Sequence, residues 1–199
     1  MRKLVVKTIC ITLASVIGAF VIAFGATAIF APAWLGGVFD GVGNYSASVF
    51  FYEKQYEKSG DIDDLDCLIS KLNIEKDSSR AVKYFGKMVA HTDFDAFCNS
   101  QNNGSDMSAK EYYCGYYALA LAFNGKLAQA ILYAHTFVEN VSYTKYNPFR
   151  LLVLDYAQTA STNEIDEILS ALNTIDGLNA NESLFLQTDK DTLVDILSN

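Results

Sequence analysis

The spacing of apolar and polar residues after position 45 predicts helices separated by short breaks. Over residues 45–58 apolar side chains recur at intervals of three to five, and Ser59-Gly60 interrupts this pattern. Asp61 fits the N-cap of a following helix, and Asp64, three residues later, has the spacing of a capping box. The sequence therefore predicts two helices joined by a tight turn near Gly60.

The same arrangement recurs further along the chain. Breaks are predicted near Asp93, Gly125 and Asn163, so that successive breaks from Gly60 onward lie 33, 32 and 38 residues apart. The segments DIDDL (residues 61–65) and EIDEI (residues 164–168) are near copies 103 residues apart, close to three periods of about 34 residues. After Leu172 the pattern predicts a loop and then a short helix that begins at Thr188.

The segment YYALALAFNGKLAQAILYA (residues 116–134) has small residues in both helices and at the turn: Ala118, Gly125 and Ala130. Gly86 and Cys98 match one unit earlier, whereas Glu53 and Tyr156 depart from the pattern in the first and last units. On these residues the region from about position 45 to 172 resembles tetratricopeptide-type repeats. The resemblance implies an all-α fold in which antiparallel helical hairpins form a short right-handed stack, an α-solenoid.

Residues 8–29 carry no charge and no proline. At ~1.5 Å per residue a helix of this length spans about 33 Å, which matches the roughly 30 Å core of a bilayer. Pro32 is expected to stop the helix, and Trp34 suits the headgroup region. We therefore divide the chain into a membrane anchor (residues 1–33), a linker (34–44) and a helical repeat domain (45–199).

Three basic residues precede the apolar segment: Arg2, Lys3 and Lys7. The positive-inside rule then predicts a single-pass membrane protein whose C-terminal domain is extracytoplasmic. A cleaved signal peptide is the alternative, because Ala26-Thr27-Ala28 fits a small-x-small cleavage site, but signal cores are typically about 7–15 residues long. The anchor followed by GNYSASVFFYEKQYEKSGDIDDL (residues 43–65) also resembles uncharacterised single-pass proteins of Gram-positive bacteria.

The formal net charge is −8, and the part from Tyr45 onward carries −10. Such an acidic body argues against nucleic acid as a partner, since phosphate binding needs a basic surface. We find no phosphate-binding loop, no G-x-S-x-G and no Cys-x-x-Cys, so the sequence predicts neither an enzyme nor a cofactor. Cys67, Cys98 and Cys114 are predicted to be free buried thiols, with a Cys98–Cys114 disulfide left open.

Basic side chains align along one predicted helix. Arg80, Lys83 and Lys87 fall at i, i+3 and i+7, with His91 in register at i+11. If the first helix of each hairpin lines a concave groove, these residues and Lys54 would form a basic strip. The strip would bind a carboxylate or an acidic segment of a protein or peptide partner. The alternative is an ordinary solvated helix face.

Four tyrosines crowd a second helix: Tyr112, Tyr113, Tyr116 and Tyr117. They are expected to fill the interface between neighbouring hairpins, while Tyr112 and Tyr116 are the candidates for a contact surface. The predicted function is a membrane-anchored scaffold that binds a protein or peptide. The alternatives are a glycan- or small-ligand-binding protein, in which the tyrosines make the contacts, and a subunit of a cell-envelope enzyme.

Overall fold

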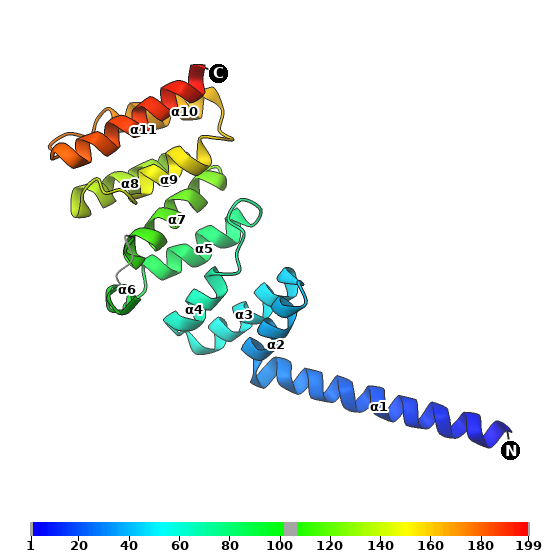
Figure 1. Cartoon of the computed structure of the whole chain (residues 1–199). Helices are drawn as coiled ribbons and strands as arrows, with labels where there is room; N and C mark the ends of the chain where they lie inside the picture. The colour runs from blue at the N-terminus through cyan, green and yellow to red at the C-terminus, as the bar shows by residue number, and fades with distance from the viewer. Residues whose placement is uncertain (1, 102–106, 199) are drawn as a thin grey trace. The chain divides into compact units, whose positions relative to one another are not determined.

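The computed structural model describes residues 2–101 and 107–198, with side chains described from Thr12 onward. Every regular element in these ranges is a helix, which confirms the prediction of an all-α chain. The chain divides into two compact units, Met1–Lys71 and Leu72–Asn199, and each is described by itself. The helices of both units are labelled in Figure 1.

The first unit contains, in order, α1 (Arg2–Phe30), α2 (Pro32–Gly41), α3 (Tyr45–Ser59) and α4 (Ile62–Ile69). Within α1, the segment Thr12–Phe30 is long and apolar enough to cross a membrane, and none of it is buried in the fold. The helix ends at Phe30, as the proline at position 32 predicts, because proline disfavours helical backbone in the residue before it. Pro32 is also the first residue of the next helix, where its missing N–H costs nothing.

The segment predicted as a linker is largely helical, since α2 extends to Gly41. Glycine has a low helix propensity, but the packing of this segment favours one of its glycines. A Cβ on Gly36 would lie 3.0 Å from ring atoms of Tyr52, so a larger residue would fit only if this ring moved, and glycine favours the close approach of α2 to α3. Phe39 stacks on Phe51 across the same contact, with the ring centroids 5.4 Å apart. Tertiary packing therefore overrides the weak helix propensity of this segment.

The turn between α3 and α4 follows the sequence closely. Gly60 adopts a left-handed conformation with φ +67°, which glycine tolerates best, and the Asp61 side chain accepts a hydrogen bond from the Asp63 N–H at 2.9 Å. The predicted capping box is wrong in one respect. The Asp64 carboxylate accepts a hydrogen bond from the Gln55 side chain, so it ties α4 to α3 instead of capping its own helix.

The second unit contains seven α-helices and one π-helix in the residues described: α5 (Ser78–Val89), α6 (Phe94–Gln101), α7 (Ala109–Phe123), α8 (Leu127–Val141), α9 (Pro148–Leu151), η1 (Leu152–Tyr156), α10 (Thr162–Leu172) and α11 (Ala180–Ser198). The breaks predicted near Asp93, Gly125 and Asn163 are confirmed to within a few residues. Gly125 has φ +71° and ends α7, for the same reason as Gly60 in the first unit.

Helix α7 is the centre of the second unit, because it packs against α5, α6, α8, α9 and η1. The small residues expected at close contacts, Ala118 on α7 and Ala130 on α8, are both fully buried. Gly115 is also in a close contact: a Cβ there would lie 2.6 Å from the Leu151 side chain. The two alanines that the sequence predicted at helix contacts are therefore both in the core of this unit.

The buried face of α5 is built around two aromatic side chains, Tyr84 and Phe85. The residues that are fully or almost fully buried are Ala81, Tyr84, Phe85 and Met88, whereas Val82 and Val89 are only half-buried. Tyr84 is completely enclosed, and its hydroxyl accepts a hydrogen bond from the Lys83 ammonium group at 2.7 Å.

The last helix begins at Ala180, eight residues before the predicted start at Thr188. Two reciprocal hydrogen bonds fix this start: the Asn179 side chain accepts from the Glu182 N–H, and the Glu182 carboxylate accepts from the Asn179 N–H. This is the geometry of a capping box, and the Asn-x-x-Glu spacing in the sequence was the missed signal. In Figure 1, α11 lies along α10 at the C-terminal end of the unit.

A further capping box supports a prediction about pH. The Glu164 carboxylate accepts hydrogen bonds from the Tyr156 hydroxyl (2.6 Å), the Ser161 hydroxyl (2.7 Å) and the Ser161 N–H (2.8 Å). These hydrogen bonds lower the pKa of Glu164 below its ordinary value of 4.5, and the bond from Tyr156 has the largest effect. Because the folded-state pKa is the lower one, the stabilisation is present above pH 4.5 and is lost as the pH falls through the folded-state value.

We expect Tyr156→Phe to raise the Glu164 pKa and to destabilise the second unit by roughly 1 kcal/mol at neutral pH, a value reduced because the carboxylate is partly exposed. The difference in melting temperature between wild type and variant should shrink as the pH falls below 4.5. Thermal melts across this pH range and NMR titration of the carboxyl would measure both effects. A difference that stays constant with pH would contradict the assignment.

Candidate functional site

A single π-helical turn, η1, directly continues the short helix α9 and ends in a turn. In η1 the Ala157 N–H donates to the Leu152 carbonyl at 2.9 Å, five residues back instead of four. Leu152, Val153 and Tyr156 are buried, while Leu154 stays 46% exposed and Asp155 faces outward. Such π-turns are rare and occur frequently at functional sites. Sequence periodicity predicted only an ordinary helix here.

A groove of about 510 Å³ lies beside this π-turn. We call it the α7–η1 groove. Its walls are the segment before α5, one face of α7, and η1 with the turn that follows; the lining residues are Leu72, Asn73, Ile74, Glu75, Tyr116, Leu119, Phe123, Leu154, Asp155, Gln158 and Thr159. Aromatic and aliphatic side chains thus form most of the surface, and a few carboxylate and amide groups lie among them.

The start of helix α7 is fixed by local hydrogen bonds, which position its face of the groove. The Ser108 hydroxyl accepts from the Glu111 N–H at 3.2 Å, and the Glu111 carboxylate accepts from the Ser108 N–H at 3.0 Å. This capping box is joined by the Thr144 hydroxyl, which donates to Glu111 from the loop after α8. Together with the close contact of Gly115 and Leu151, these bonds make the groove largely preformed.

The electrostatics of the groove favour a cation. No hydrogen bond or ion pair engages the Asp155 carboxylate among the residues that the structure describes, and burial raises the pKa of this carboxyl. Burial, and then the nearby charge of Asp155, also raises the pKa of Tyr116. A partly desolvated carboxylate without a partner would gain from an ammonium or guanidinium group brought by a ligand.

The predicted basic residues lie elsewhere. On α5, Arg80, Lys83 and Lys87 are exposed, and two of them flank the ring of Tyr84: the ammonium nitrogens of Lys83 and Lys87 lie 4.5 and 5.6 Å from its centroid. Lys54 belongs to the other unit, where it pairs with Glu57 at 2.6 Å. The three α5 residues share one helix face, as predicted.

His91 does not extend the basic strip, because α5 ends at Val89. Its Nδ1 instead accepts a hydrogen bond from the Asp93 N–H at the start of α6. The strip on α5 is therefore shorter than the sequence spacing suggested.

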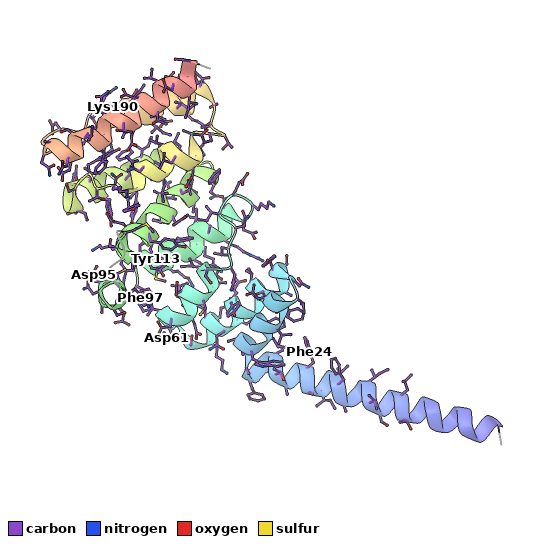
Figure 2. All side chains as sticks on the ribbon, in the orientation of Figure 1. Phe24, Asp61, Asp95, Phe97, Tyr113 and Lys190 are labelled. Carbon is purple, nitrogen blue, oxygen red and sulfur yellow. The ribbon has the colours of Figure 1, made fainter. Side chains whose placement is uncertain are left out.

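The tyrosines of α7 mainly fill contacts between helices, as expected for an interface. Tyr113 is buried against Phe94 and Phe97 of α6, with ring centroids 6.1 and 5.9 Å away; Phe97 and Tyr113 are labelled in Figure 2. Of the two tyrosines proposed as contact residues, Tyr116 lines the α7–η1 groove. The ring centroid of Tyr112 lies 4.6 Å from that of Tyr116. One predicted contact residue thus reaches the groove and the other supports it.

A second cavity, of about 440 Å³, lies between the end of α8 and the segment before α11. Several of its polar groups already bind one another. The Ser142 hydroxyl donates to Glu182, which also accepts from the Asn179 N–H at 2.9 Å, and His135 lies 3.5 Å from the Thr174 hydroxyl. We rank this cavity below the α7–η1 groove, where Asp155 has no such partner in the described chain.

Of the three cysteines whose side chains the structure describes, the two buried ones are not reactive nucleophiles. Cys98 and Cys114 are free and buried, and burial raises the pKa of Cys98 to about 11, so that the thiol stays protonated and inert at neutral pH. Cys67 is also free but exposed, which corrects the prediction that it is buried. Within residues 2–101 and 107–198, no group of three or more His, Cys, Asp or Glu residues is placed to hold a metal ion.

Of the residues that line the groove, the sequence identified Tyr116 and missed, among others, Leu154 and Asp155. A usable signal was present: residues 151–154 read LLVL, and a helix that buries one face cannot bury four consecutive apolar residues. Comparison with known proteins gives no further guidance, because the chain matches no family model, no curated protein and no solved structure.

Proposed function

We propose that the chain is a membrane-anchored, non-catalytic interaction module that binds an extended segment of a partner protein in the α7–η1 groove. The observation that carries this proposal is the groove itself, in which Leu154 is 46% exposed beside the unpartnered carboxylate of Asp155. A concave, mostly apolar surface with a few polar groups is the usual form of a binding site. The partner segment would bring an apolar side chain and a neighbouring Lys or Arg.

The anchoring part of the proposal rests on α1. Its apolar segment Thr12–Phe30 is unburied and has the length of a membrane span. With Arg2, Lys3 and Lys7 on the cytoplasmic side, the second unit would face the outside, where it could meet other proteins of the cell envelope.

The proposed architecture of the second unit is a tetratricopeptide-like stack. In support, α7 contacts both α5 and α9–η1, while α8 contacts α9 and α10. This order fits first helices that lie side by side and second helices behind them. In such a stack the first helices line the concave face, and α7 and η1 are the two that line the groove.

Photo-crosslinking tests the groove directly. A benzophenone amino acid in place of Leu154 should capture one recurring protein segment in intact cells, and that segment should contain basic residues. Leu132 on α8 is the matched control, because it is also an exposed leucine (67%) but lies outside the groove. Equal capture at the two positions, or none at Leu154, would contradict the proposal.

The captured segment can then be synthesised and its affinity for the purified chain measured by fluorescence anisotropy. We expect Asp155→Lys to weaken binding by tenfold or more, since a hydrogen bond to a charged group contributes roughly 1.5–3 kcal/mol. Asp166→Lys, an exposed acid on α10, should leave binding unchanged. If Asp155→Lys has no effect while Lys83→Glu with Lys87→Glu abolishes binding, the basic strip on α5 is the site instead.

A further inference from the structure

An uncharged surface continues from α1 onto α2 in the first unit. Along α2 the side chains of Leu35 and Pro32 are buried, whereas Trp34 and Val38 face outward, followed by Val42 one turn later. These outward residues lie at i, i+4 and i+8, so they form one stripe. A helix that faced water would carry polar residues on this stripe.

The distribution of charged residues in this region also favours contact with lipid. Over residues 8–52 the one charged side chain is Asp40. Its carboxylate lies 2.7 Å from the Lys71 ammonium group, and this hydrogen bond, as the largest cause, raises the pKa of Lys71. The charge is therefore compensated within the unit. Neither α2 nor the first turns of α3 present an uncompensated charge that would oppose contact with lipid.

A groove of about 380 Å³ lies between the last turns of α1 and α2. Its lining is almost wholly apolar and includes Phe20, Ala23, Trp34 and Val38. The polar exception is Thr27, whose hydroxyl donates to the Ala23 carbonyl within α1 at 2.9 Å. The indole N–H of Trp34 is the other hydrogen-bonding group in the lining, and the remaining surface is hydrocarbon, so the groove suits a hydrocarbon better than a polar ligand.

The angle between α1 and α2 is held by contacts to α3. Phe24, labelled in Figure 2, packs edge-to-face on Phe51 with ring centroids 6.3 Å apart. The Lys58 ammonium group donates to the Phe30 carbonyl at 3.3 Å, which satisfies a carbonyl at the end of α1 and places a charge where the apolar span ends. The groove is thus preformed and opens beside the outer part of the span.

We infer that α2 lies in the interface of the leaflet into which α1 leads, and that an acyl chain of a phospholipid fills the α1–α2 groove. This inference rests on the proposed anchoring of α1. The span forms one wall of the groove, so hydrocarbon chains of the surrounding leaflet reach it without leaving the bilayer. Trp34 and Tyr45 then lie at the depth where aromatic residues anchor membrane proteins.

The chain contains a single tryptophan, so its intrinsic fluorescence reports on Trp34 alone. The full chain is reconstituted into phospholipid vesicles with or without bromine on the acyl chains. We expect brominated lipid to cause a severalfold loss of emission, and acrylamide in the water to cause little. Trp34 emission that is quenched by acrylamide but not by bromine would overturn the inference. Trp34 emission that neither agent quenches would also overturn it, because a second copy of the protein would then occupy the groove.

The matched control moves the reporter to the second unit. In Trp34→Phe with Leu184→Trp, the tryptophan occupies a position 65% exposed, close to the 63% of Trp34. This reporter should be quenched by acrylamide and not by brominated lipid. Equal quenching by bromine in the two proteins would overturn the inference, because contact with lipid would then not be specific to α2.

A second pair of variants tests occupancy of the groove. Ala23→Phe adds a ring to its lining and should displace the acyl chain, which lowers bromine quenching of Trp34. Ala26→Phe is the matched control, since Ala26 is exposed on α1 but lies outside the lining. Equal quenching in both variants would overturn the assigned occupant.

Vesicle flotation after an alkaline wash reports anchoring by α1 independently. A chain that floats while Trp34 is quenched from the water overturns this inference and leaves the proposed anchoring intact. A chain that does not float overturns both.

Discussion

Ala130→Glu should unfold the second unit or lower its stability by roughly 4 kcal/mol or more. Ala130 on α8 is fully inaccessible and belongs to the same buried cluster as Leu121 and Leu127. A carboxylate at this position would lose its hydration without gaining a partner, which costs several kcal/mol per ion. The measurement is the loss of helical circular dichroism with temperature or urea.

Ala128→Glu on the same helix is the matched control. Ala128 is exposed and lies in the first turn of α8, where a negative charge interacts favourably with the helix dipole. This variant should therefore melt within a few degrees of the wild type. If the two variants melt alike, α8 does not bury the face that the structure assigns to it.

Features set by a few neighbouring residues were predictable from the sequence. Gly60 and Gly125 end helices because each adopts a positive φ that side chains disfavour, and the residues around them carry that information locally. The small residues Ala118 and Ala130 could also be recognised locally. Close contacts between helices tolerate little side-chain volume, and both alanines are fully buried.

Features set by distant contacts were not predictable in the same way. Helix α2 was missed because its glycines suggest a loop, and the reason for Gly36 is a ring sixteen positions away, that of Tyr52. The π-turn at η1 buries Leu152 and Val153 of the apolar run and leaves Leu154 exposed. The α7–η1 groove depends on this turn, so sequence periodicity identified Tyr116 but neither Leu154 nor Asp155.

Helix α11 is held to the rest of the second unit by a buried charged group, which leads to the second large expected effect. Asp189 is fully buried; its Oδ1 lies 2.8 Å from the Arg150 Nη1, and its Oδ2 accepts a hydrogen bond from the Tyr143 hydroxyl at 2.6 Å. The contact with Arg150 is close but not aligned as a hydrogen bond. Burial raises the pKa of Asp189 despite both partners, so desolvation is the dominant influence on this carboxyl.

Asp189→Ala should therefore destabilise the second unit by about 3–5 kcal/mol, because it leaves the largely buried Arg150 and the Tyr143 hydroxyl without their partner. For a unit of this size the melting temperature should fall by roughly 10 °C or more. Asp191→Ala is the control: this carboxylate accepts a hydrogen bond from Gln187 at the surface of the same helix and should contribute little.

The double variant Arg150→Met with Asp189→Leu separates the cost of an unpaired charge from the value of the pair. It removes both desolvated charges and adds apolar surface beside Phe185, whose ring lies 5.6 Å from the Arg150 guanidinium. We expect it to regain most of the stability lost in Asp189→Ala, since a buried ion pair replaced by apolar residues is often neutral. If the double variant is as unstable as Asp189→Ala, the pair itself stabilises α11. Asp189→Ala with an unchanged melting temperature would instead show that apolar contacts such as those of Leu193, which is fully buried on the same helix, suffice to hold α11 in place.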